Sequence, residues 1–466
     1  MKTIPSILTL LISLCPLLHA ESKPNFIIIF ADDQGYNDLG CFGSETIKTP
    51  HIDKMAEEGR KFTSFYVGSS VCTPSRAALL TGSYPKRLSM ARGVIFPNND
   101  YGLHPDEVTI ADMLKQSGYA TACVGKWHLG HEETLLPTKQ GFDSYYGIPY
   151  SNDMNHPRKK GEKKNGKKIP RRDESWKDQE AAWQAWNTPL MQGEEIIELP
   201  VNQRTITRRY TDKAIEFITA NKEQPFFLYL AHTMPHVPLF VPEDAYDPDP
   251  ANAYKCVIEH MDAETGRILE AVKELGLSDN TYVIYTSDNG PWLKYDNHGG
   301  SAKPLRDGKM TTYEGGQRVP TVMWAPGRIP AGTETDEMAS TLDLLPTIAK
   351  LSGSELKPRG PIDGLDISDL IHGADESPRS EFLYYSMRGA LSAIRQGDWK
   401  LRLHKSKNTA ATTELYNLAE DIGEQNNLAE KYPEKVETLT QRMRELDGEI
   451  GKGVRKRGSH KKLVKQ

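Results

Sequence analysis

The chain has 466 residues, 38% of them hydrophobic, with 30 prolines, 37 glycines and a formal net charge of -5. This length suits one large and one small domain, and the composition is typical of a loop-rich globular protein, which excludes a helical bundle and a disordered chain. The modest net charge also excludes a molecule that binds polyanions through its bulk charge.

The first twenty residues have the pattern of a secretory signal peptide. A positively charged start precedes an apolar run over 4–18, and the small Ala20 follows. This run is shorter than the about 20 apolar residues of a membrane-spanning helix. We therefore expect removal of residues 1–20, export to a bacterial periplasm or exterior, and no stable membrane insertion. A lipoprotein that is processed at Cys15 is an alternative, although Leu14 is bulkier than lipoprotein processing usually tolerates.

Four short apolar runs each lead into polar residues that can carry chemistry. They are 25–31, 120–124, 226–231 and 281–286, and they end at Asp32-Asp33, at Lys126-Trp127-His128, at His232 to His236 and at Ser287-Asp288-Asn289-Gly290. Strands that are apolar throughout are buried on both faces, which predicts a mostly parallel sheet covered by helices. Ligands bind beyond the carboxyl ends of such strands, so we expect these polar residues to meet at one edge.

Helical patterns lie between the apolar runs. Apolar residues recur every three or four positions in 52–59, 109–118, 207–221 and 254–276. The alternation of strand and helix predicts an α/β fold with a mixed, mostly parallel sheet sandwiched by helices.

The pattern changes after residue 351. A Gly- and Pro-rich connection precedes four short strand-like runs and a helical segment, at 381–387, 390–395, 400–404, 414–418 and 433–450. We therefore expect a large domain over 21–375 and a small α+β unit over 376–466, with a four-stranded sheet, a helix and a basic tail.

Two stretches are strongly basic, 158–172 and 452–465. Solvated loops are the ordinary interpretation of such stretches. The first one closely follows Tyr150-Ser151-Asn152-Asp153, so an alternative is that it attracts an anionic polysaccharide toward a nearby site. Nucleic acid is not an expected partner of an exported protein.

The segment from Cys72 to Gly82 reads CTPSRAALLTG. It places a thiol near the fixed cation of Arg76 at the start of a helix-like run, and both features favour negative charge at the thiol. A lone cysteine is more often a small buried apolar residue. Here the whole segment resembles the sulfatase signature C-x-P-S-R-x-x-x-x-T-G. The segment from Gly118 to His128 resembles the second signature of the same family, and 147–151 and 311–316 look most like arylsulfatase A and N-acetylgalactosamine-6-sulfatase.

Oxygen donors follow two of the apolar runs: Asp32, Asp33, Asp288 and Asn289. Adjacent carboxylates repel each other unless a cation lies between them. Oxygen ligands that include an amide suit Ca²⁺ better than zinc. Asp-Asp alone would indicate a turn or a helix cap, but the resemblance implies that these four residues and residue 72 hold Ca²⁺.

The resemblance implies an alkaline-phosphatase-like fold and a formylglycine-dependent sulfatase. A maturation enzyme would convert Cys72 to formylglycine (3-oxoalanine), whose hydrate attacks sulfur while Asp288 accepts a proton. His236, rather than His232, would protonate the leaving oxygen, and His128 would take a proton from the second hydroxyl when sulfate is released. The implied catalytic residues are Cys72, Arg76, Lys126, His128, His236, Asp288 and Lys309, of which Arg76 and the two lysines would stabilise the sulfate.

The expected substrate is a sulfated sugar of the galactose or N-acetylgalactosamine type in a polysaccharide. Candidate sugar contacts are Tyr150, Ser151, Asn152, Asp153, His298, Lys303 and Arg306. Two alternatives stay open. One is a phosphonate monoester or phosphodiester hydrolase of the same superfamily, and the other is a non-catalytic binder of sulfated glycans.

Overall fold

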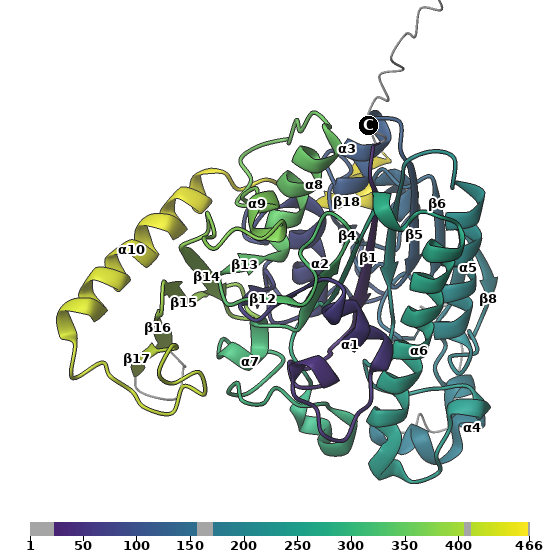
Figure 1. Ribbon diagram of the computed structural model, residues 1–466, viewed down its shortest axis with the longest axis horizontal. Helices are drawn as coiled ribbons and strands as arrows, with labels where there is room; N and C mark the ends of the chain where they lie inside the picture. Colours follow the sequence, from purple (N-terminus) through teal and green to yellow (C-terminus); the bar gives the residue numbers. More distant parts are fainter. Residues whose placement is uncertain (1–22, 156–170, 405–411, 465–466) are drawn as a thin grey trace, which may run out of the picture.

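The computed structural model describes residues 23–155, 171–404 and 412–464 (Figure 1). The predicted signal peptide and most of the basic stretch at 158–172 lie outside these residues. The described part contains a ten-stranded sheet in the order β12-β2-β11-β10-β1-β9-β5-β6-β7-β8. Its strands are β1 (Asn25–Ala31), β2 (Arg60–Phe62), β5 (Ala120–Gly125), β6 (Ser144–Gly147), β7 (Leu190–Gln192), β8 (Glu195–Glu198), β9 (Phe226–Ala231), β10 (Thr281–Ser287), β11 (Thr321–Trp324) and β12 (Thr333–Thr335).

The central strands β10, β1, β9, β5 and β6 run parallel to one another. The flanking strands β11 and β7 pair antiparallel with β10 and β6. In β1 all seven residues are buried, because successive side chains point to opposite faces and helices cover both. The sheet therefore has the mixed, mostly parallel form that the apolar runs predicted.

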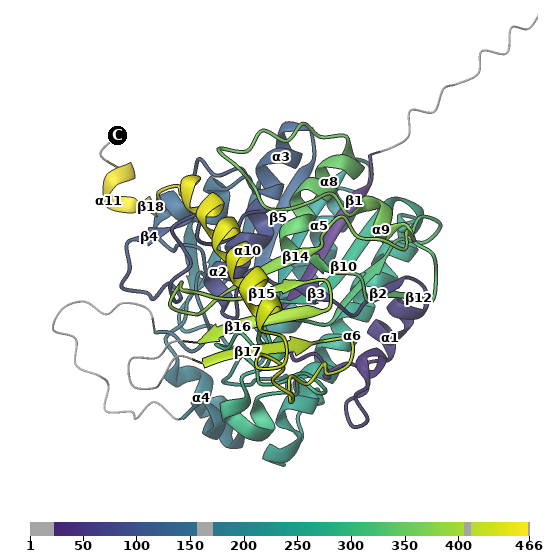
Figure 2. The same ribbon diagram turned by 90° about the vertical axis from the view of Figure 1, so that its left-hand side faces the viewer.

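Helices cover both faces of the sheet (Figures 1 and 2). Ile27 and Ile29 pack on the face covered by α1 (Pro50–Glu57), α5 (Ile206–Ala220) and α6 (Ala253–Glu274). Phe26, Ile28 and Phe30 pack on the opposite face, which is covered by α2 (Cys72–Thr81), α3 (Ile110–Gln116) and α8 (Leu344–Ser352). This arrangement confirms the predicted fold class, an α/β sandwich.

Local sequence signals explain where two of these helices begin and end. Thr109 caps α3, because its hydroxyl accepts from the backbone N–H of Asp112 while the Asp112 carboxylate accepts from the backbone of Thr109. Gly82 ends α2 in the left-handed conformation with φ of 59°, which glycine adopts without a steric penalty.

Four antiparallel strands form a second sheet, β14 (Glu381–Tyr385), β15 (Leu391–Gln396), β16 (Trp399–His404) and β17 (Thr412–Asn417). The long helix α10 (Pro433–Lys452) packs against this sheet (Figure 2). After α10 the chain returns to the large domain, where β18 (Gly458–Ser459) pairs with β4 (Tyr101–Gly102). The remaining short strands and α-helices are β3 (Phe65–Tyr66), α4 (Gln179–Ala185), α7 (Glu314–Gln317), β13 (Ala339–Ser340), α9 (Ser368–Ile371) and α11 (His460–Leu463).

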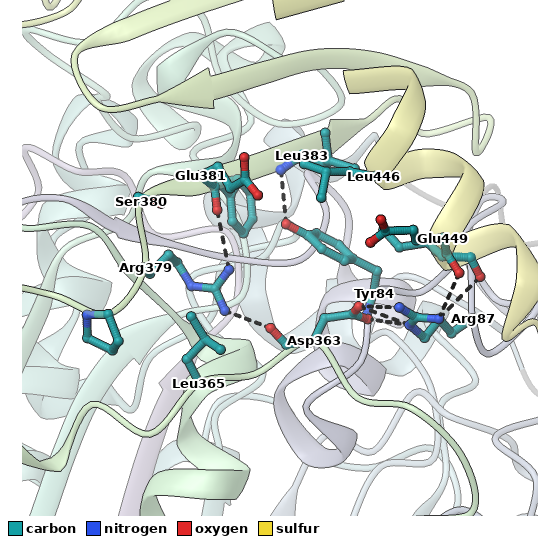
Figure 3. Close-up of a pocket in the computed structure, with 13 residues that line it drawn as sticks. Tyr84, Arg87, Asp363, Leu365, Arg379, Ser380, Glu381, Leu383, Leu446 and Glu449 are labelled. Carbon is teal, nitrogen blue, oxygen red and sulfur yellow. Dashed lines mark hydrogen bonds and ion pairs between the residues drawn. The ribbon is translucent and has the colours of Figure 1, made fainter. Parts of the chain in front are cut away.

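Polar groups join the small sheet and α10 to the large domain. A cavity of about 230 Å³ lies between them, and Tyr84 crosses it to accept a hydrogen bond from the backbone of Leu383 (Figure 3). Beside it, Arg87 pairs with Asp363, and Arg379 donates to the backbone carbonyl of Asp363.

A buried ion cluster forms a second connection. Lys400 of β16 is fully buried and lies 2.8 Å from Glu314 of α7 and 2.9 Å from Glu424. Glu314 also accepts hydrogen bonds from Tyr66 and Tyr384. A charged lysine at a buried position is costly unless it is paired, so this cluster fixes the small sheet relative to α7.

No helix within the described ranges combines the length and the apolar character that crossing a bilayer requires.

Candidate active site

The carboxyl ends of β1, β5, β9 and β10 bring the predicted polar residues together at one edge of the sheet. Asp32 and Asp33 follow β1, Lys126 follows β5, and Asp288 follows β10. Cys72 is the first residue of α2 and is 2% exposed, and its thiol donates to Asp32 at 3.4 Å. The structure therefore places the predicted nucleophile position against the predicted metal ligands.

The thiol of Cys72 is a poor nucleophile in this environment. Burial raises the pKa of Cys72 well above its ordinary value, and the nearby carboxylate of Asp288 raises it further. The ammonium group of Lys309 lies 3.7 Å from the sulfur and lowers this pKa, but its effect does not outweigh the other two. Because the thiolate is the reactive form of cysteine, these protein groups disfavour direct attack by an unmodified Cys72.

Four side chains offer a compact set of ligand atoms. One atom each from Asp32, Asp33, Cys72 and Asp288 lies within 4.8 Å of the other three. The neighbouring Asn289 has a buried side-chain oxygen, Oδ1, with no hydrogen-bond partner among the described residues, while its amide nitrogen donates to Asp33. Three carboxylates and an unpaired amide oxygen fit a hard divalent cation such as Ca²⁺.

Arg76 holds the carboxylate of Asp288. Its Nε and Nη2 both donate to Asp288 Oδ2, at 3.0 and 2.9 Å, and its Nη1 donates to the carbonyl of Lys126 at 2.8 Å. Arg76 is fully buried, one turn along α2 from Cys72. It therefore ties three segments of the site together rather than projecting into open space.

Two lysines contact the carboxylates. Lys126 donates to Asp32, and to Ser151 Oγ at 3.3 Å. Lys309 donates to both oxygens of Asp33 at 2.6 Å. Burial alone would lower the pKa of each lysine, but the adjacent carboxylates raise it, so both stay cationic. The site thus has two fixed positive charges next to Cys72.

His128 lies after β5 with a φ of 62°, and its tautomer follows from its partner. Nε2 is 3.0 Å from the carbonyl oxygen of Ile95, which can only accept, so Nε2 carries the hydrogen. Nδ1 is buried without a partner among the described residues and is free to accept a proton. Burial and the charges of Lys126 and Arg76 lower the pKa of His128 well below its ordinary value, which keeps the ring neutral.

His236 is oriented by its neighbours. Its Nδ1 lies 2.7 Å from the carbonyl oxygen of Val237 and 3.1 Å from Asn152 Oδ1, so Nδ1 carries a hydrogen. Its Nε2 lies 3.7 Å from Asp33 and 3.4 Å from Ser151 Oγ. Burial, Lys309 and Lys126 lower the pKa of His236 well below its ordinary value. By contrast, neither ring nitrogen of His232 has a partner among the described residues.

The candidate sugar contacts do not all lie together. Ser151 and Asn152 contact the catalytic histidine candidate, as described above. Tyr150 is buried with its ring against His131, and Lys303 is exposed. Arg306 donates to the carbonyl of Glu424 and to Tyr416, next to the small sheet. His298 is buried in the segment that packs on residues 250–252.

Two further residues lie beside the site: Trp292, which sequence reasoning missed, and Arg172, which it included only as the last residue of the basic stretch 158–172. The ring centroid of Trp292 lies 5.5 Å from the ring centroid of His236. It lies 4.4 Å from Lys309 Nζ. Arg172 pairs with Asp153 at 2.7 Å. Trp292 lies two residues beyond the Ser287-Asp288-Asn289-Gly290 segment, which was the one sequence signal that could have indicated it.

Comparisons with known proteins extend the resemblance over most of the chain. The family model "Sulfatase" matches residues 24–354, and the model "N-sulphoglucosamine sulphohydrolase, C-terminal" matches residues 306–449. Arylsulfatase A of Bos taurus is 37% identical over 468 residues, which cover 94% of this chain and 90% of that protein. N-acetylgalactosamine-6-sulfatase of Canis lupus familiaris is 36% identical over 396 residues, which cover 82% and 72%.

A solved structure, that of Ps i-CgsB in complex with k-i-k-neocarrahexaose, is also similar. The TM-score is 0.77 at 30% sequence identity, and the match covers 91% of this chain and 93% of that one. The similarity therefore includes the large sheet and the small sheet together.

Proposed function

The chain belongs to the sulfatase family, and we propose that it removes O-sulfate from sugars of a sulfated polysaccharide, with residue 72 converted to formylglycine and with Ca²⁺ as its metal. As a member of this family it is a sulfuric ester hydrolase. The observation that carries the proposal is the buried cluster in which Cys72 lies among three carboxylates and two lysines. The names of N-acetylgalactosamine-6-sulfatase and of the neocarrahexaose complex support a sugar substrate.

The metal would be held by Asp32, Asp33, Asp288 and Asn289, together with residue 72. When bound there, Ca²⁺ supplies Lewis acidity toward the sulfate oxygens and orients the nucleophile. Its binding would also account for the buried Asn289 oxygen that has no hydrogen-bond partner among the described residues.

Formylglycine supplies, as its hydrate, a hydroxyl nucleophile that a buried, protonated thiol does not. Lys126 and Lys309 then bind the sulfate oxygens, where their charges stabilise the negative charge that develops during transfer. Asp288 accepts the proton of the attacking hydroxyl, and Arg76 keeps its carboxylate in position. His128 accepts a proton from the second hydroxyl when sulfate is released. It does so at Nδ1, because its Nε2 donates to the carbonyl oxygen of Ile95.

His236 protonates the leaving oxygen from Nε2. Asn152 and the carbonyl of Val237 fix the ring by holding Nδ1, so the second nitrogen faces the site. Burial and the cations of Lys309 and Lys126 lower the pKa of His236 in the free protein. The negative charge of a bound sulfate ester would act in the opposite direction and favour the protonated ring that donates to the leaving oxygen.

The proposal includes export and maturation. The signal-peptide pattern over residues 1–20 supports secretion to a bacterial periplasm or exterior. A maturation enzyme that oxidises Cys72 is a required partner, since the hydroxyl nucleophile depends on it.

Two measurements on one preparation test the proposal. Mass spectrometry of the tryptic peptide that bears residue 72 should show formylglycine in place of cysteine. Assays of free sulfate with defined sulfated saccharides should show turnover, and paired aryl sulfate and aryl phosphonate substrates should favour the sulfate. An active preparation that retains an unmodified cysteine would refute the proposed nucleophile, and faster turnover of the phosphonate would refute the substrate class.

A further inference from the structure

The leaving group of a bound sulfate ester lies on the His236 side of the site. This follows from the proposed function, because His236 Nε2 must reach the leaving oxygen to protonate it. Trp292 occupies that side, with its ring next to both His236 and Lys309. The atoms bonded to the leaving oxygen therefore lie beside the indole, which can pack against their C–H groups.

A cluster of polar and aromatic groups continues from Trp292. Arg172 donates through Nε to Asp153 Oδ2 at 2.8 Å and through Nη1 to the hydroxyl of Tyr295 at 3.2 Å. Its guanidinium lies 5.7 Å from the ring centroid of Trp292 and 5.9 Å from that of Trp186. The ring of Tyr295 meets Trp292 edge to face at 4.8 Å. These contacts hold the arginine in one place beside the indole.

The Arg172–Asp153 pair keeps hydrogen-bonding capacity that these contacts do not use. The side chain of Asp153 is only 8% exposed, and its Oδ1 has no hydrogen-bond partner within the described part of the chain. Arg172 is 34% exposed and has five N–H groups, of which its bonds to Asp153 and Tyr295 use three. A carboxylate acceptor and free N–H donors therefore lie side by side.

A hydroxyl group both donates and accepts, so two neighbouring hydroxyls of a sugar ring match an adjacent acceptor and donor. The C–H groups of the same ring match an indole. An aryl or steroid leaving group offers the apolar contact alone. The cluster thus has the mixed apolar and polar character of a saccharide subsite.

We propose that Trp292, Arg172 and Asp153 form the leaving-group subsite, in which the Arg172–Asp153 pair selects a saccharide over an aryl group. This inference rests on the proposed function and narrows it, because it assigns the recognition of the sugar to residues outside the catalytic set. Its rival is a purely structural ion pair, in which Arg172 and Asp153 stabilise the loops and have no part in substrate choice.

The test compares kcat/KM for a sulfated saccharide with kcat/KM for 4-nitrophenyl sulfate. In Arg172→Met the ratio of the two values should fall about 10–100-fold, mainly through KM for the saccharide, because hydrogen bonds to charged groups are lost. In Arg172→Lys the ratio should fall less, since lysine keeps the positive charge and an N–H donor group. Trp292→Ala should lower both activities, because either leaving group packs on the indole.

Arg267→Met is the matched control. Arg267 of α6 pairs with Asp212 of α5 and with Glu264 of α6, so this variant removes ion pairs outside the cluster. Its ratio should stay within about two-fold of wild type. Titration calorimetry with the unsulfated saccharide gives a second readout, in which wild type should bind and Arg172→Met should bind at least 10-fold more weakly.

Three results would overturn the inference. An equal fall of both activities in Arg172→Met, or a fall in melting temperature with an unchanged ratio, would assign the pair a structural role. A wild type that turns over aryl sulfate but no saccharide would overturn the subsite while leaving sulfatase activity intact. A matured, metal-loaded wild type that releases sulfate from neither substrate would overturn the proposed function itself.

Discussion

Lys400→Met should destabilise the protein by about 3–5 kcal/mol, which is the usual cost of removing one partner from a buried ion pair. The replaced ammonium is fully buried between Glu314 and Glu424. Glu314 keeps Tyr66, Tyr384 and Arg318 as partners, so most of the cost falls on Glu424. Burial raises the pKa of Glu424, and without Lys400 this carboxyl would have to be protonated or leave the interior.

Urea unfolding followed by tryptophan fluorescence would measure the effect. Lys431→Met, at an exposed lysine of the same C-terminal unit, is the control and should change the free energy of unfolding by less than about 0.5 kcal/mol. The double variant Lys400→Met/Glu424→Gln should recover at least about 1 kcal/mol, because it removes the stranded charge. A single variant as stable as the control, or a double variant less stable than the single one, would refute the reasoning.

Three further predictions concern the metal, the leaving group and pH. EDTA should abolish sulfate release and lower the melting temperature, Ca²⁺ should restore both, and full activity after chelation would contradict the metal site. His236→Ala should lower kcat by about 10²–10⁴-fold for a sugar sulfate but much less for 4-nitrophenyl sulfate, whose phenolate leaves without a proton, so equal losses would exclude this role. Asp38 is buried and accepts from Tyr254 and from the backbone of Gly35 and Ser301, and burial raises its pKa to about 6. A carboxyl whose pKa is raised by folding stabilises the protein below pH 4, and this stabilisation is lost as the pH rises through 6. Between pH 4 and 7 the free energy of unfolding of Asp38→Asn, measured with urea, should therefore increase by about 3 kcal/mol relative to that of wild type. A decrease relative to wild type would contradict the sign of this effect.

The central strands and main helices could be predicted because burial leaves a periodic pattern in the sequence. The run from Phe26 to Ala31 is apolar throughout and lies in β1 (Asn25–Ala31), and the helix expected at 254–276 is α6 over Ala253–Glu274. The shorter strands on either side of the sheet centre, β2, β6, β7, β8, β11 and β12, were missed. They have only three or four residues each, too few to show a period.

Some residues of the site could likewise be predicted from the sequence, and others could not. Asp32, Asp33 and Asp288 could be predicted to meet, because parallel strands end at one edge of a sheet. Lys309 lies in an irregular loop and was indicated by family resemblance alone. The cluster of Arg172 with Trp292 joins loops more than a hundred residues apart, and no local pattern encodes a contact of that kind.

The burial of Cys72 has a consequence for the order of events during synthesis. All ten residues of α2 are buried, and Cys72 itself is 2% exposed. An enzyme that oxidises this side chain must therefore act before the chain closes over it. Asp288 and Lys309 lie more than 200 residues further along, so residue 72 leaves the ribosome long before the groups that will enclose it. If Cys72 is oxidised to formylglycine as proposed, the maturation enzyme can reach it on the nascent chain during this interval.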